Sequence, residues 1–179
     1  MTLEEMKTKV YSLIEEYSEN EDNLTEDTDL ATKMNSVINQ IQNELSRFKK
    51  ITAYKTMNVV ENQEITLSSI DLNIYQLNII KNVDYDLYGD TVHFNEEGTA
   101  KIYYYKYPKQ ITNDTDDNYK FELSTDVLEI MPYGVAGDLL KSDVSSNYGK
   151  IYSDRYMQMI QQLDPRYSLG SIYIEGGID

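Results

Sequence analysis

The fold of this chain is decided by the stretch Lys101-Ile102-Tyr103-Tyr104-Tyr105-Lys106-Tyr107. Aromatic and β-branched residues favour extended strands, and the length of this run is typical of a β-strand. Pro108 follows directly and should end the strand, because proline cannot donate a hydrogen bond to a sheet. The stretch therefore predicts a β-strand in the middle of the chain.

Further extended segments precede this strand. Apolar residues tend to alternate across residues 54–107, as they do in half-buried strands. The alternation changes phase between Ile74 and Tyr75, which predicts a bulge or two short strands. The segment Asn95-Glu96-Glu97-Gly98 separates two strand runs and predicts a hairpin turn. The predicted strands are 55–60, 64–67, 71–80, 90–94 and 99–107.

Helical spacing replaces this pattern towards the N-terminus. Thr2 and Glu5 have the spacing of a capping box and predict the start of a first helix. An acidic connection, residues 18–29, leads to a second helix that begins at Asp27 or Thr28. The two helices should form an α-hairpin with a shared apolar face. The face comprises Leu3, Met6, Val10, Leu13, Ile14 and Tyr17, then Leu30, Met34, Val37, Ile38, Ile41, Leu45 and Phe48.

Helical spacing returns near Ser124. Pro132 should lie in the first turns of this helix or split it, because proline removes a donor and clashes with the preceding turn. Gly134, Ala136 and Gly137 are small and close together, which predicts a close contact with another helix. The predicted buried residues are Val127, Leu128, Met131, Val135, Leu139 and Leu140.

The chain closes with a helix and a strand. The helix runs from about 146 to 163, and Asp164-Pro165 ends it. Its predicted face is Ile151, Tyr152, Arg155, Tyr156, Met159, Ile160 and Leu163. The tail that follows alternates as a strand and is bounded by glycines. It either adds to a sheet edge of a neighbouring subunit or pairs with its own sheet. The candidate partner-contact residues of this arm are Ile172, Tyr173, Ile174 and Glu175.

The order of these elements predicts an α+β fold. It consists of an N-terminal helical hairpin, an antiparallel β segment, a C-terminal helix pair and a terminal strand. A length of 179 residues fits a single domain. Within it we expect a helical body (1–50 and 124–165), a β-rich insertion (54–122) and a C-terminal arm (168–179).

Charge and composition narrow the class of partner. The net charge is -15, with 31 acidic and 16 basic residues. This excess argues against binding a phosphate backbone or an anionic membrane, because both attract clustered Lys and Arg. No apolar run has the length of a membrane span. The chain has no cysteine, which excludes disulfides and thiolate sites. The 17 tyrosines against 3 phenylalanines favour strands and interfaces.

Few residues are suited to catalysis. His93 is the only histidine and no serine-elbow motif accompanies it, so we expect a half-exposed strand residue. The acidic loops 19–29 and 113–118 contain oxygen ligands for calcium, but lack the glycine and glutamate positions of an EF-hand. We therefore predict a protein that is not an enzyme, without catalytic residues, a metal or a cofactor.

The C-terminal helices carry a resemblance to a known family. The residues are Asp126-Val127-Leu128-Glu129-Ile130-Met131-Pro132-Tyr133-Gly134-Val135-Ala136-Gly137-Asp138-Leu139-Leu140-Lys141-Ser142-Asp143, followed by Ile151-Tyr152-Ser153-Asp154-Arg155-Tyr156. They resemble the helix, the turn and the following Arg-Tyr helix of tailed-bacteriophage head–tail connector (adaptor) proteins. The N-terminal helical pair is similar to the helices with which such proteins begin. The tyrosine-rich β segment departs from the shorter, all-helical members.

The resemblance implies a structural protein of the virion neck, located between capsid and tail and made in the host cytoplasm. Copies, typically twelve, would form a ring that binds the portal protein and the next tail or neck protein. Double-stranded DNA would pass through the ring without sequence-specific binding, and an acidic lumen would repel its phosphates. No cofactor and no membrane are implied.

Two other functions are compatible with the sequence. The charge also suits an acidic inhibitor or DNA mimic that binds a basic enzyme. Acidic residues confined to one DNA-like face would favour the inhibitor or DNA mimic. Acidic residues distributed over the whole fold would argue against it. A calcium-binding enzyme or adhesin module is the third, and stabilisation by calcium would distinguish it.

Overall fold

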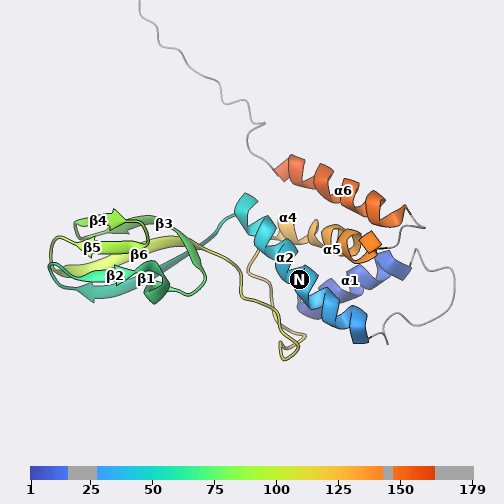
Figure 1. Cartoon of the computed structure of the whole chain (residues 1–179), viewed down its shortest axis with the longest axis horizontal. Coiled ribbons are helices and arrows are strands. Elements are labelled where there is room, and N and C mark those ends of the chain that lie inside the picture. Colours follow the sequence, from blue (N-terminus) through green and yellow to red (C-terminus); the bar gives the residue numbers. More distant parts are fainter. Residues whose placement is uncertain (16–27, 143–146, 164–179) are drawn as a thin grey trace, which may run out of the picture.

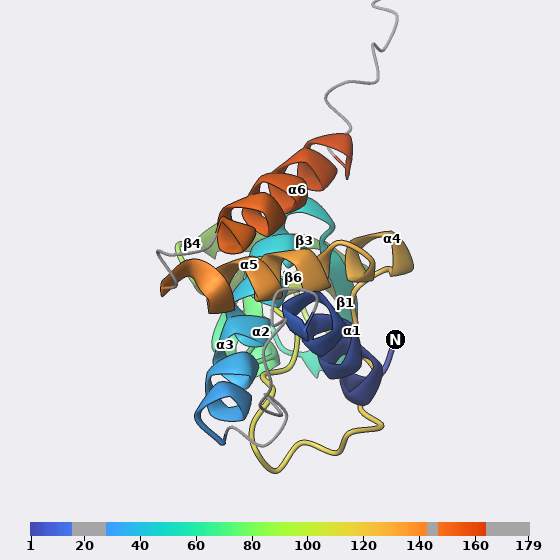
Figure 2. The same ribbon diagram turned by 90° about the vertical axis from the view of Figure 1, so that its right-hand side faces the viewer.

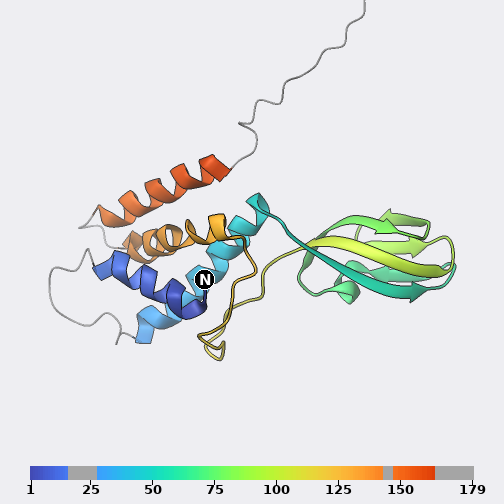
Figure 3. The same ribbon diagram turned by 180° about the vertical axis from the view of Figure 1, so that it is seen from behind.

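The structure, a computed structural model, describes residues 1–15, 28–142 and 147–163. These residues form two lobes that follow one another along the long axis of the molecule (Figure 1). One lobe contains helices, the other contains β-strands, and two segments of chain join them (Figure 3). The chain has an α+β fold, as predicted.

The described helices of the first lobe are α1 (Leu3–Glu15), α2 (Thr28–Phe48), α4 (Thr125–Leu128), α5 (Met131–Leu139) and α6 (Tyr148–Leu163), with a 3-10 turn η2 (Leu140–Ser142) after α5. The capping box of α1 is confirmed. The Thr2 amide donates to Glu5 Oε2 over 2.9 Å, and the Glu5 amide donates to Thr2 Oγ1 over 3.2 Å. Two donors that a helix start leaves free are thus satisfied.

Helix α5 is the centre of this lobe. It lies between α6 on one side and α1 and α2 on the other (Figure 2). Apart from Asp138 near its end, its residues are small, apolar or aromatic, as expected for a helix surrounded by others. Helices α1 and α2 therefore meet mainly through α5, whereas the sequence predicted a hairpin in which they pack on each other.

The small residues of α5 allow a close approach to α6. A Cβ added to Gly134 would lie 2.8 Å from the ring of Tyr156, and one added to Gly137 would lie 2.7 Å from Ser153 Oγ. Both distances are shorter than a van der Waals contact, so only glycine fits. The predicted close helix contact is confirmed, and Pro132 separates α4 from α5 at the first turn of α5.

The helical core contains most of the predicted apolar residues. Two of them are instead exposed, Phe48 by 39% and Ile151 by 53%. Phe48 is the last residue of α2, where the chain leaves for the β lobe, and Ile151 lies on the solvent side of α6. Fully or nearly fully buried are Leu3, Met6, Val10, Ile14, Met34, Ile38, Ile41, Leu45, Val127, Leu128, Met131 and Val135.

The β lobe contains two three-stranded antiparallel sheets. The first has the order β1 (Ile51–Val59), β6 (Gly98–Lys106), β3 (Ile74–Lys81). The second has the order β2 (Glu64–Thr66), β5 (Thr91–Phe94), β4 (Tyr85–Tyr88). A short helix, α3 (Leu67–Ile70), follows β2. Their inner faces enclose a second hydrophobic core around Val92, Phe94, Ala100 and Ile102, which are fully buried.

Two predictions for the strands were wrong. Asn95–Gly98 is not a hairpin turn, because β5 and β6 belong to different sheets and the segment carries the chain from one to the other. Strand β4 was missed; it pairs with β5 across the turn at Gly89, whose φ of +61° suits the first position of a tight hairpin. The predicted bulge is confirmed, since the pairing of β3 with β6 shifts after Ile74 and again after Leu77.

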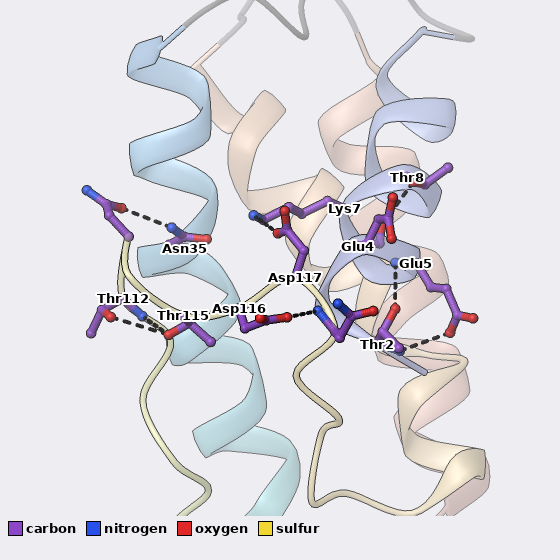
Figure 4. Close-up of polar contacts among 12 residues, drawn as sticks. Thr2, Glu4, Glu5, Lys7, Thr8, Asn35, Thr112, Thr115, Asp116 and Asp117 are labelled. Atoms are coloured by element: carbon purple, nitrogen blue, oxygen red, sulfur yellow. Dashed lines mark hydrogen bonds and ion pairs between the residues drawn. The ribbon is translucent and has the colours of Figure 1, made fainter.

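The segment after β6 returns to the helical lobe. Asn39 Oδ1 accepts from the Ile111 amide over 2.7 Å, and its amide group donates back to the Ile111 carbonyl over 2.8 Å. The amides of Leu3 and Glu4 donate to the Tyr119 and Asp117 carbonyls. Residues 109–123 therefore pack with the helices, whereas the prediction assigned residues up to 122 to the β-rich insertion. Figure 4 shows this segment crossing α1 and α2.

The predicted terminal strand and the arm 168–179 lie outside the described residues. Of the helices that the structure describes, none is both long and apolar enough to span a membrane.

Candidate interaction surface

The most distinctive surface of the molecule is the outer face of the first sheet. On β6, Ala100, Ile102 and Tyr104 are buried in the core between the sheets. Because side chains alternate along a strand, Lys101, Tyr103 and Tyr105 point away from that core.

Five tyrosines cluster on this outer face. Tyr54 on β1 pairs directly with Tyr103, and their ring centroids are 5.8 Å apart. Tyr75, at the bulge of β3, lies 6.4 Å from Tyr105 and 4.7 Å from Tyr107. Ring pairs at these distances stabilise a sheet beyond the area that they bury.

Basic side chains cover the rings. Lys101 Nζ lies 4.7 Å from the centroid of Tyr54 and 5.1 Å from that of Tyr103. On the same face, Lys81 Nζ lies 5.4 Å from Tyr103, and Lys50 Nζ lies 4.3 Å from Tyr105. These distances are those of cation–π contacts.

The end of α2 adds one more cation. Arg47 Cζ lies 5.7 Å from the Tyr107 ring, and Arg47 Nη2 donates to the Tyr107 hydroxyl over 3.1 Å. We call this surface the cationic tyrosine face; it comprises Tyr54, Tyr75, Tyr103, Tyr105 and Tyr107 with Arg47, Lys50, Lys81 and Lys101.

No carboxylate belongs to the three strands of this sheet, although the chain has 31 acidic residues. The acidic residues of the β lobe lie in the second sheet and in the connections. They are Glu61, Glu64, Asp71, Asp84, Asp86, Asp90, Glu96 and Glu97. The strands of the first sheet thus contain basic and no acidic residues, whereas those of the second sheet contain Glu64 and Asp86 and no lysine or arginine.

The outer face of the second sheet carries acidic side chains. Val92 and Phe94 of β5 point into the core, so His93 points outward, and its register partners are Glu64 and Asp86. His93 Nδ1 lies 3.4 Å from Glu64 Oε1. The side-chain amide of Asn95 donates to Asp84 Oδ2 and to Asp86 Oδ2, each over 3.1 Å, which holds these two carboxylates close together. We call Glu64, Asp84, Asp86 and Glu96 the acidic sheet face.

Three groups of the first sheet have a raised pKa. Burial, and then the neighbouring Tyr107 and Tyr105, raises the pKa of the Tyr75 hydroxyl. The hydrogen bond to Tyr103 raises the pKa of the Lys101 ammonium. On the inner side, burial and the hydrogen bond to Asp71 raise the pKa of Tyr104 to about 12. That bond, from Tyr104 Oη to Asp71 Oδ2, measures 3.0 Å.

The helical lobe carries a pocket of about 350 Å³ between α1, α5 and α6. Thr8, Ser12 and Leu13 of α1 line one side, and Pro132 and Tyr133 of α5 line the other. At its edge, Lys9 and Glu129 form an ion pair of 3.0 Å between exposed side chains. Apolar atoms dominate the wall, and no histidine contributes to it.

The structure places some predicted site residues and not others. His93 is a partly exposed strand residue, as expected. In the 113–118 loop, Thr115 and Asp116 form local turns with Thr112 and Asn118. Within residues 1–15, 28–142 and 147–163, no three acidic or histidine side chains come close enough to hold a metal ion. The candidate arm residues Ile172, Tyr173, Ile174 and Glu175, and most of the 19–29 loop, lie outside the described residues.

Sequence reasoning missed the cationic tyrosine face. The signal was present: Lys101, Tyr103, Tyr105 and Tyr107 alternate on one side of a strand, and β1, β3 and β6 contain no acid. It becomes visible only when the register places Tyr54 beside Tyr103 and Lys81 beside Lys101. No protein-family model and no curated protein matches this sequence, so its function has to be inferred from its own residues.

Proposed function

We propose that the protein is a structural adaptor of a tailed-bacteriophage neck. Copies of the chain would form a ring, with twelve members if the resemblance holds, that joins the portal protein to the next tail protein. The observation that supports an interaction protein best is the cationic tyrosine face. Tyrosine and arginine are enriched at protein interfaces, where a rigid ring supplies apolar contact and its hydroxyl a hydrogen bond.

The helical lobe supports the adaptor assignment in particular. The residues that resemble connector proteins form α4, α5 and α6, which pack closely through Gly134 and Gly137. A stiff helical body of this kind suits a ring subunit, because neighbouring copies need surfaces of fixed shape.

Charge supports the proposed passage of DNA. At -15 per copy, a ring would surround the genome with negative charge, which repels phosphates and lowers nonspecific binding. The acidic residues occur in both lobes, for example Glu4 and Glu129 in the helical lobe and Asp86 in the β lobe. A mimic of DNA would instead concentrate them on one elongated face.

The test is an affinity pull-down of the tagged chain from the cells that produce it, with mass spectrometry of the proteins recovered. We expect the portal and a tail protein in stoichiometric amount, and rings in electron micrographs of the eluate. A strain that expresses the tag alone is the control. Recovery of a nuclease, a polymerase or another basic protein without virion components would contradict the adaptor and favour an acidic inhibitor.

A further inference from the structure

We propose that the cationic tyrosine face of one copy binds the acidic sheet face of the next copy, so that β lobes associate head to tail. The inference rests on the proposed function, because it supplies a contact between neighbouring subunits of the ring. It assigns a task to the β lobe, which the resemblance to connector proteins leaves without one.

The geometry excludes contact between the two faces of a single copy. The first and second sheets enclose one core, so their outer faces point in opposite directions. Lys81 and Lys101 therefore cannot contact Glu64 and Asp86 of the same chain. An interface built from two different patches is heterologous, and such contacts produce a ring when the rotation between copies closes.

Charge complementarity favours a second copy of this chain as the partner that binds the cationic tyrosine face. The cationic tyrosine face contains four basic residues, and its three strands contain no carboxylate. The acidic sheet face offers Glu64, whose side chain is 66% exposed, and Asp86, one on each side of His93. Opposite potentials on two surfaces steer their encounter and fix their register.

The tyrosines supply the apolar part of the contact. Tyr54 is 62% exposed and Ile79 is 42% exposed, and the two residues flank Tyr103 of the central strand as its register partners. Exposed apolar residues grouped in this way mark interaction sites. Rings that already pack against one another lose little freedom when a partner covers them, which favours binding.

Single-stranded nucleic acid is the competing occupant, since it stacks on aromatic rings and pairs its phosphates with cations. The observations favour a second copy, because a phosphate strand would also meet the repulsion of a chain at -15. The two occupants give different results in the experiment below.

The experiment compares charge-reversal variants of the full chain by sedimentation over a range of concentrations and ionic strengths. One variant reverses the cationic tyrosine face, Lys81→Glu with Lys101→Glu. A second reverses the acidic sheet face, Glu64→Lys with Asp86→Lys. A third carries all four changes. Lys141→Glu with Lys150→Glu, on the helical lobe, has the same charge change as the first variant and serves as its control. Circular dichroism verifies that each variant folds.

We expect the wild type and the control to self-associate, more weakly at high salt. Each face variant should lose association, with a Kd raised about tenfold or more, because two attractions become repulsions. An equal mixture of the two face variants, and the variant with all four changes, should associate again. In the wild type, a carbodiimide should then cross-link Lys81 or Lys101 of one copy to Glu64 or Asp86 of another.

Four results would overturn the inference. The first is a wild type that stays monomeric at its highest soluble concentration, and the second is a four-change variant that stays dissociated. The third is an oligothymidine that binds the wild type, with binding abolished by the Lys81 and Lys101 changes and kept by the Glu64 and Asp86 changes. The fourth is a wild type that associates equally well when either face is reversed, in which case the head-to-tail contact is wrong while the ring remains possible. If the two faces bind each other as expected but the pull-down recovers no portal protein, the adaptor function is wrong and the head-to-tail contact between copies is still supported.

Discussion

The helical lobe and the β lobe are built in opposite ways. The helical lobe combines residues from before the β lobe (1–15 and 28–48) with residues from after it (109–142 and 147–163), around α5. The β lobe uses one continuous stretch, residues 51–106, whose first and last strands pair along their whole length from Ile51 with Lys106 to Val59 with Gly98. The chain therefore enters and leaves the β lobe at one point.

This difference explains how a sheet module fits into a helical protein. Because β1 and β6 close the module on itself, its core contains no residue of the helical lobe. The helical lobe depends instead on the returning segment, which Asn39 and the fully buried Gln42 hold through hydrogen bonds to Ile111 and Lys109. Two cores in one chain lead to the question of whether they unfold together.

The largest expected effect tests that independence. Phe94→Ala removes a fully buried ring from the β core and should cost about 3–5 kcal/mol of unfolding free energy. The β lobe should then unfold at lower urea concentration, while the helical far-ultraviolet dichroism keeps its wild-type midpoint. The proton NMR signals of the sheet tyrosine rings, assigned residue by residue, report the first transition.

The matched variant is Met34→Ala, which removes a fully buried side chain from the helical core. It should lower the helical transition and leave the β transition in place. If both variants shift both signals together, the lobes form one cooperative unit, which is the behaviour of the single domain predicted from the sequence.

The next effect concerns the packing of α5 on α6, which has no counterpart in the β lobe. Gly137→Ala places a Cβ 2.7 Å from Ser153 Oγ and 3.0 Å from the Ser153 amide nitrogen. Overpacking of this kind costs about 1–3 kcal/mol, so the helical transition should shift and the β transition should not.

A second substitution distinguishes the clash from a general effect on the helix. Ser153→Gly removes the nearest atom and should recover part of the lost stability in the Gly137→Ala chain. The backbone nitrogen of residue 153 stays close, so recovery should be incomplete. A stability gain from Gly137→Ala alone, as helix propensity would give, contradicts the close contact.

The two lobes also differ in how far the sequence predicts them. The helices follow from local signals: the capping box at Thr2 and Glu5, the apolar stripe from Met34 to Leu45, and the small residues of α5. Alternation predicted the positions of all strands except β4, but it did not predict the pairing, because the paired strands other than β4 and β5 lie far apart in the chain. The pairing of β1 with β6 spans the whole module, and the short β4 carries little pattern of its own.

The candidate surface shows the same limit. Each tyrosine and lysine of the cationic tyrosine face is visible in the sequence, but their neighbours come from β1, β3, β6 and the end of α2. Only the register brings them together. The sequence did indicate an interface through its excess of tyrosine, and it attributed the contact to the C-terminal arm, which the structure does not describe.

The last expected effect concerns the inner side of the first sheet and depends on pH in the alkaline range. The folded pKa of Tyr104 is about 12, against 10.0 for an ordinary tyrosine. Below pH 10 the hydroxyl is protonated in both states and its contribution is complete. Between pH 10 and 12 the unfolded chain loses this proton while the folded chain keeps it, so stability falls by up to about 1.4 kcal/mol per pH unit.

Tyr104→Phe should therefore flatten the decline of β-lobe stability between about pH 10 and 12, measured as urea midpoints of the tyrosine signal. At neutral pH the variant should be less stable than the wild type by about 1.5–3 kcal/mol, because the buried end of Asp71 loses its hydrogen bond. Tyr54→Phe, which removes a hydroxyl from an exposed ring of the same sheet, is the matched control. The helical transition should keep its pH dependence in both variants, since Tyr104 touches only the β core. An equal slope in Tyr104→Phe and the wild type would show that this proton does not couple to folding of the sheet.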